Sequence, residues 1–162
     1  MRTRLPVVAG VVALVAVGLL PPAVSVGAST TATRTDFDGN GTSDVAIFRP
    51  STGGWFVQGG LSTTWGTTGD VAVPGDYNGD GRTDVAVYRP SDQSWFVQPS
   101  GSFPAGLTTQ WGVTGDIPVP ADFNGDGRTD IAVFRSADQT WYVQPSGSFP
   151  AGLSTQWGAA GD

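Results

Sequence analysis

The sequence predicts an all-β fold, a partial β-propeller of three four-stranded antiparallel blades. Two observations carry this prediction. A nine-residue acidic loop occurs three times, starting at Asp36, Asp76 and Asp122, and short apolar strands follow each copy. The copies begin 40 and 46 residues apart. Four short strands in a repeat of this length are typical of a propeller blade.

The second repeat shows the predicted strands most clearly. Residues 71–73, 84–89, 95–98 and 108–111 are rich in β-branched and aromatic side chains, and residues 90–93 have the composition of a turn. Such runs, bounded by turn residues, favour strands. The acidic loop therefore lies between the first and second strands of the blade.

Two differences separate the repeats. Thr31-Ala32-Thr33 of the first repeat stands where the second has Val71-Ala72-Val73, so we expect a frayed or absent first strand there. The segment after the third strand is six residues longer in the second and third repeats, with a Pro/Gly/Ser composition. Insertions of this kind belong in surface loops.

The predicted strands are apolar on both faces. Val85 and Val87 point to one side of their strand, whereas Ala86 and Tyr88 point to the other. A sheet with one face in water would alternate apolar and polar residues. Each sheet is therefore expected to have a neighbour on both sides. From the repeated loops and strands, we divide the chain after residue 28 into three repeats, at residues 29–69, 70–115 and 116–162.

Residues 1–28 have the pattern of a secretory signal peptide. Arg2 and Arg4 form a basic start, Leu5 to Leu20 is apolar, and small residues precede a predicted cleavage site after Ala28. The alternative is a membrane anchor, but the apolar run is shorter than the roughly 20 residues that a span needs. The sequence therefore predicts a secreted, extracellular protein with no membrane span after cleavage.

Composition narrows the function. All fourteen acidic residues are Asp, all eight basic residues are Arg, and the formal net charge is −6. This charge argues against nucleic acid as a partner, because nucleic-acid binding needs a basic face. The chain has neither His nor Cys, and every Asp occupies a repeated position, so no carboxylate stands out as catalytic. We therefore expect a protein that is not an enzyme.

The acidic loops have the pattern of a cation site. Oxygen-bearing side chains occupy positions 1, 3, 5 and 9, glycines occupy positions 4 and 6, and each copy carries three carboxylates. Calcium takes six to eight oxygen ligands, and glycine lets a short loop fold tightly. The alternative is a set of Asp/Gly-rich turns without an ion. The loops are Asp36 to Asp44, Asp76 to Asp84 and Asp122 to Asp130.

These loops, each followed by an apolar strand such as Asp84-Val85-Ala86-Val87-Tyr88, resemble the FG-GAP/VCBS repeat family. The resemblance extends over about residues 30–162 and implies one structural calcium ion in each loop, between the first and second strands of a blade. It implies these ligands, with the seventh position contributing its carbonyl: Asp36, Asp38, Asn40, Thr42 and Asp44; Asp76, Asn78, Asp80, Arg82 and Asp84; Asp122, Asn124, Asp126, Arg128 and Asp130.

Members of this family usually close a ring of about seven blades, and propellers in general need at least four. Three repeats cannot close a ring. Three alternatives follow: the chain is a fragment, it forms an open stack, or it associates with other copies to complete a ring. The expected function is a non-catalytic binding or adhesion module for an extracellular protein or glycan. The alternatives are a calcium-dependent lectin-like module and an accessory fragment of a larger secreted enzyme.

Six tryptophans recur in the repeats. Trp55, Trp95 and Trp141 lie inside predicted strands, and we expect them in the core. The other three are each followed by glycine near a strand end, and two roles are considered for them, core packing and contact with a glycan or protein partner: Trp65, Trp111 and Trp157. Arginines end the second strand of each repeat, and we expect local pairing with Asp92, Asp138 or the Gly-Asp turns: Arg49, Arg89 and Arg135.

Overall fold

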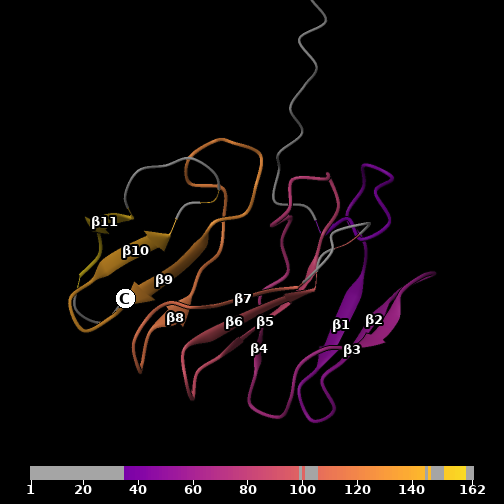
Figure 1. Cartoon of the computed structure of the whole chain (residues 1–162), viewed down its shortest axis with the longest axis horizontal. Helices are drawn as coiled ribbons and strands as arrows, with labels where there is room; N and C mark the ends of the chain where they lie inside the picture. Colours follow the sequence, from indigo (N-terminus) through magenta and orange to yellow (C-terminus); the bar gives the residue numbers. More distant parts are fainter. Residues whose placement is uncertain (1–34, 99, 101–105, 145, 147–151, 160–162) are drawn as a thin grey trace, which may run out of the picture.

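The protein consists of three antiparallel β-sheets that lie side by side (Figure 1). The computed structural model describes residues 35–98, 100, 106–144, 146 and 152–159, and these residues contain no helix. The described part therefore has no helix that could cross a membrane. The predicted signal peptide and the segment Thr31-Ala32-Thr33 lie outside the described residues.

Each sheet is a simple meander in which strands that are consecutive in the sequence pair with each other. The first sheet contains β1 (Ala46–Arg49), β2 (Gly54–Val57) and β3 (Ser62–Thr64). The second contains β4 (Val71–Ala72), β5 (Val85–Arg89), β6 (Ser94–Gln98) and β7 (Leu107–Gln110). The third contains β8 (Ile117–Pro118), β9 (Ile131–Arg135), β10 (Thr140–Gln144) and β11 (Leu153–Gln156).

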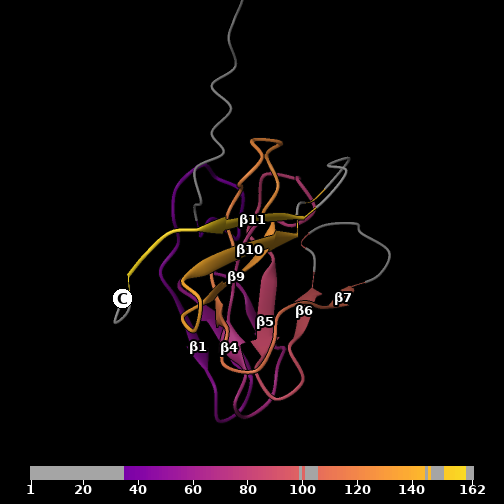
Figure 2. The same ribbon diagram turned by 90° about the vertical axis from the view of Figure 1, so that its left-hand side faces the viewer.

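The all-β prediction is confirmed, and the second and third sheets have the four strands expected of them. The first sheet has three strands within the described residues. Viewed from the side of the third sheet, the sheets lie one behind another (Figure 2). The described residues therefore form an open row of three sheets, which agrees with a partial propeller without establishing a closed one.

The core lies between the sheets, as predicted from the apolar residues on both sides of the strand that is β5 in the structure. Val85 and Val87 pack toward the first sheet, in a cluster with Trp55. Ala86 and Tyr88 belong to a second cluster, shared with the third sheet. Both faces of β5 are buried, because a sheet lies on each side of it.

The strand tryptophans follow this arrangement. Trp55 and Trp95 are buried, as expected of core residues. Trp141, at the same position of the third sheet, is only partly buried. The difference arises because the third sheet ends the row, so no further sheet in the described residues covers this face.

Two ion pairs fix the entry of the chain into the second and third sheets. Arg89 binds Asp70 through two hydrogen bonds of 2.9 and 3.0 Å, and Arg135 binds Asp116 with the same two distances. The predicted pairing of these arginines with the Gly-Asp turns is therefore confirmed. The hydrogen bond to Asp70 is the main cause that raises the pKa of Arg89.

Candidate metal centres in the acidic loops

The acidic loops lie at corresponding places in the three repeats. Residues 76–84 connect β4 to β5, residues 122–130 connect β8 to β9, and residues 36–44 precede β1. In the second loop, Asp76 Oδ1 accepts the N–H of Gly79 at 2.6 Å, and Asp76 Oδ2 accepts that of Gly81 at 2.8 Å. Both glycines have positive φ angles, of 78° and 84°, which few other residues adopt.

The first position of each loop is thus a carboxylate surrounded by backbone N–H groups. At Asp36 these come from Gly39, Asn40 and Gly41. Burial acts to raise the pKa of Asp36, but these N–H groups outweigh it and hold the pKa below its ordinary value. The loop therefore stabilises the ionised form, which is the form that binds a cation.

The ninth position is a carboxylate buried behind the loop. Asp84 and Asp130 are fully buried. Asp84 Oδ2 accepts the N–H of Tyr77 at 2.9 Å, and Asp130 Oδ2 accepts that of Phe123 at 2.8 Å. Burial raises the pKa of Asp84, and the N–H groups of Ser100 and Tyr77 offset part of this effect.

Among the residues that the structure describes, these buried carboxylates have no basic partner. The ion pairs within the described residues join Arg89 to Asp70 and Arg135 to Asp116, and neither involves Asp84 or Asp130. A buried charge is costly unless it is paired or coordinates a metal. Within the described residues, backbone N–H groups rather than arginines therefore contact the carboxylates at the ninth position.

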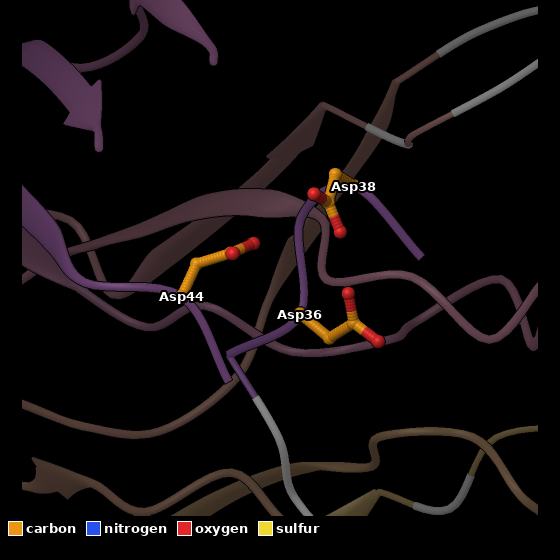
Figure 3. A group of neighbouring side chains, drawn as sticks. All are labelled: Asp36, Asp38 and Asp44. Carbon is orange, nitrogen blue, oxygen red and sulfur yellow. The ribbon is translucent and has the colours of Figure 1, made fainter. Parts of the chain in front are cut away.

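The first loop brings three carboxylates together. Oxygen atoms of Asp36, Asp38 and Asp44 all lie within 4.8 Å of one another (Figure 3). Two ligands of one calcium ion can be no more than about 5 Å apart, since each Ca–O distance is about 2.3–2.6 Å. The separation therefore fits one shared ion. Among the described residues, such a group of three carboxylates occurs only in this loop.

In the second and third loops, a serine from the longer insertion occupies the space beside the carboxylates. Ser100 donates its hydroxyl to Asp80, at 3.0 and 2.9 Å to the two oxygens, and its N–H to Asp84 at 2.5 Å. Ser146 makes the same contacts with Asp126 and Asp130. The carboxylates at positions 5 and 9 of these two loops are therefore both hydrogen-bonded to the serine.

Ser100 and Ser146 are the site residues that sequence reasoning missed. A signal was present, because the insertion that carries the serine occurs only in the repeats with Asn at the third loop position, Asn78 and Asn124. The side-chain amide of Asn78 donates to the carbonyl of Ser100 at 3.1 Å, and Asn124 does the same to Ser146 at 3.2 Å. The first repeat has Asp38 at this position and lacks the insertion.

The remaining predicted ligands lie in the same loops. The third-position side chain accepts the N–H of the fifth residue, at 3.0 Å for Asp38, 2.8 Å for Asn78 and 2.8 Å for Asn124. The fifth-position side chain in turn accepts the N–H of the seventh residue. Each loop therefore curls around its own side-chain oxygens. The fifth and seventh residues are Asn40 and Thr42, Asp80 and Arg82, and Asp126 and Arg128.

The first and second loops also contact the loop of the next repeat. The N–H of Thr83 donates to the carbonyl of Asp36 at 2.7 Å, and the N–H of Thr129 donates to the carbonyl of Asp76 at 2.6 Å. The Arg82 side chain lies over Gly39, where an added β-carbon would be 2.8 Å from its Nε atom. Loop geometry and sheet packing are therefore coupled.

Two of the three tryptophans considered for partner contact lie between sheets. Trp65 donates its indole N–H to the carbonyl of Phe96 at 3.1 Å, and Trp111 donates to the carbonyl of Tyr142 at 3.2 Å. Trp157, at the corresponding position of the third sheet, is 77% exposed. Only Trp157 of these three therefore presents most of its surface to solvent.

Three antiparallel sheets, each associated with an acidic Asp/Gly loop, define a β-repeat protein. Residues 76–133, from the start of the second loop into β9, match the family model described as an FG-GAP-like repeat. This stretch is therefore an FG-GAP-like repeat, and the family predicted from the three loops is confirmed there. Comparisons with curated proteins and with solved structures gave no match.

Proposed function

We propose that this protein is a secreted, calcium-stabilised module of the β-propeller type that acts by binding a partner. The observation that carries the calcium proposal is the pair of fully buried carboxylates, Asp84 and Asp130, without a basic partner in the described residues. A divalent cation in each of the second and third loops would offset two of the three negative charges that the carboxylates at positions 1, 5 and 9 carry.

Calcium would have a structural role. The side chains at positions 1, 3, 5 and 9, with the carbonyl at position 7, would hold the ion, and the ion would supply positive charge and fix the loop. Because consecutive loops are hydrogen-bonded to each other, an ordered loop would also support the packing of neighbouring sheets. The chain has no disulfide, so metal binding would take over part of that stabilising role.

The experiment that tests this proposal counts the calcium ions. Isothermal titration of the wild-type chain should give three sites, and Asp84→Asn should give two, because the substitution removes one charged ligand and keeps the shape of the side chain. Asp92→Asn is the matched control, since it changes the charge equally at an exposed position outside the loops. Equal stoichiometry in both variants and the wild type would refute the assignment of Asp84.

The non-catalytic part of the proposal rests on how the carboxylates are used. Asp70 and Asp116 bind arginines, the loop carboxylates accept backbone N–H groups, and Asp138 accepts the hydroxyl of Tyr142 at 3.0 Å. A hydrolytic site would need a nucleophile or an acid–base pair set apart from such structural contacts. The predicted signal peptide supports the extracellular location, where calcium is abundant enough to fill weak sites.

A second candidate function is glycan binding, and one groove favours it. A cavity of about 440 Å³ opens between the second and third sheets. It combines aromatic rings with hydrogen-bonding side chains, a mixture that suits a sugar. The lining residues are Gln93, Gln110, Trp111, Gly112, Arg135 and Tyr142.

A glycan array separates the two candidates. If the groove binds sugar, the wild-type chain should bind a defined subset of glycans, and Gln110→Ala should weaken that binding several-fold. Gln156→Ala is the matched control, because Gln156 has the same place and the same type of backbone contact in the third sheet. An array without binding would leave a protein partner as the proposed ligand.

A further inference from the structure

The two contacts between neighbouring sheets are built from the same parts. At each contact, a tryptophan of one sheet donates its indole N–H to a strand carbonyl of the next, Trp65 to Phe96 and Trp111 to Tyr142. A glycine of the next sheet faces this ring: an added β-carbon at Gly106 would lie 3.6 Å from the Trp65 ring, in van der Waals contact, and 2.7 Å from the carbonyl oxygen of Val97. The corresponding distance from Gly152 to Trp111 is 3.4 Å.

The third sheet repeats the donor half of this contact without a partner. Trp157 occupies the position of Trp65 and Trp111, is 77% exposed, and has no acceptor for its indole N–H among the described residues. Gly125 corresponds to Gly39 and Gly79, over which arginines of the next loop lie, yet an added β-carbon at Gly125 would meet nothing within 4 Å. Phe123, on the same loop, is also exposed.

The first sheet carries the other half of this contact, which is the face and the strand carbonyl that receive a tryptophan from the preceding sheet; we call it the acceptor half. Val45 and Ile47 correspond to Val85 and Val87, which are 4% and 0% exposed, but they are themselves 67% and 60% exposed. Phe56, which corresponds to Phe96 and Tyr142, is exposed as well. The two ends of the row therefore carry the two complementary halves of a contact that the chain already makes twice.

Gly60 completes this acceptor half. It aligns with Gly106 and Gly152, the glycines that face Trp65 and Trp111, and an added β-carbon there would meet nothing within 4 Å. Ser43 likewise aligns with Thr83 and Thr129, which bind the preceding acidic loop.

We propose that two copies of this chain associate head to tail, with Trp157 of each copy on the exposed face of the other's first sheet. In this contact the indole of Trp157 packs on Gly60 and donates to the carbonyl of Phe56, while Ser43 binds the carbonyl of Asp122. Val45 and Ile47 are then buried, as Val85 and Val87 are within one chain.

A second copy is the occupant favoured by the structure, because each end matches the other end of this chain position by position. A heterologous contact of this kind forms a ring when its rotation closes and an open fibre when it does not. The described residues of two copies together provide six sheets, within the four to eight blades of known closed propellers. Closure would also cover the exposed apolar faces, which otherwise favour aggregation.

Native mass spectrometry of the purified full chain in millimolar calcium tests this proposal. The wild type should have twice the mass of one chain. Trp157→Ala should shift the population to single chains, and Gly60→Val should do the same by blocking the surface on which Trp157 packs. Gly60 does not have a positive φ angle, so valine there should leave the single chain folded, as circular dichroism can verify.

Leu153→Ala is the control. Leu153 is an exposed residue of the third sheet whose counterpart Leu107 stays exposed although a sheet follows it. This variant should keep the double mass. A wild type that remains a single chain at micromolar concentration would overturn the proposal. If Trp157→Ala dissociates the dimer but Gly60→Val does not, the head-to-tail contact is also overturned, because this result would indicate that the third sheets of the two copies contact each other. Assemblies of more than two copies would overturn the closed two-copy ring.

Discussion

Several millimolar calcium should raise the thermal unfolding midpoint of this protein by roughly 10 °C or more over its value in chelator. Extracellular calcium modules have dissociation constants of about 10⁻⁴ to 10⁻³ M. At tenfold excess over such a constant, each site adds about 1.4 kcal/mol to the free energy of unfolding. Three sites add about 4 kcal/mol, which corresponds to the stated shift for a domain of this size.

Tryptophan fluorescence during heating measures this shift, because Trp55 and Trp95 are buried in the folded chain. Magnesium at the same concentration is the control. It requires near-ideal octahedral geometry and loses its water reluctantly, so its effect should be much smaller. An unchanged midpoint with calcium would mean that the acidic loops hold no ion and that Asp84 and Asp130 remain buried without one.

The fold could be predicted because strand patterning is local. The alternation of Val85 and Val87 with Ala86 and Tyr88 implied two apolar faces, and the structure places each pair against a different neighbouring sheet. The turn at residues 90–93 is likewise a local property, although Gln93 adopts a positive φ angle of 57° that its residue type does not suggest. Both features depend on a few consecutive residues.

The site was less predictable because part of it comes from distant segments. Ser100 reaches Asp84 across 16 residues of sequence, and nothing local to the acidic loop indicates this contact. The loops are therefore unequal, although their oxygen patterns are the same. The first loop gathers three carboxylates, whereas in the second a serine hydroxyl and N–H occupy the space beside Asp80 and Asp84.

The tryptophans show a third limit of sequence reasoning. Trp65, Trp111 and Trp157 have the same local sequence, yet the first two lie between sheets and the third is exposed. Local patterning gives the face on which each side chain lies. Whether that face is covered depends on where the repeat stands in the row of sheets.

Replacing Trp95 by alanine should lower the free energy of unfolding by about 3–5 kcal/mol, the usual cost of deleting a buried large aromatic residue. Trp95 is fully buried in the cluster between the second and third sheets, and its ring centre lies 5.1 Å from that of Tyr88. It also donates its indole N–H to the carbonyl of Trp111 at 3.1 Å. The substitution would leave both a cavity and an unpaired carbonyl.

Urea unfolding followed by circular dichroism measures this loss as a lower midpoint with an unchanged slope. Trp141→Ala is the matched control, since Trp141 has the same strand position and donates to the carbonyl of Trp157 at 3.3 Å. Because Trp141 is only partly buried in a single chain, its replacement should cost about 2 kcal/mol, in proportion to the smaller area removed from water. The comparison is made at concentrations where single chains predominate. Equal losses there would contradict the expectation, because Trp95 is covered by a following sheet and Trp141 is not.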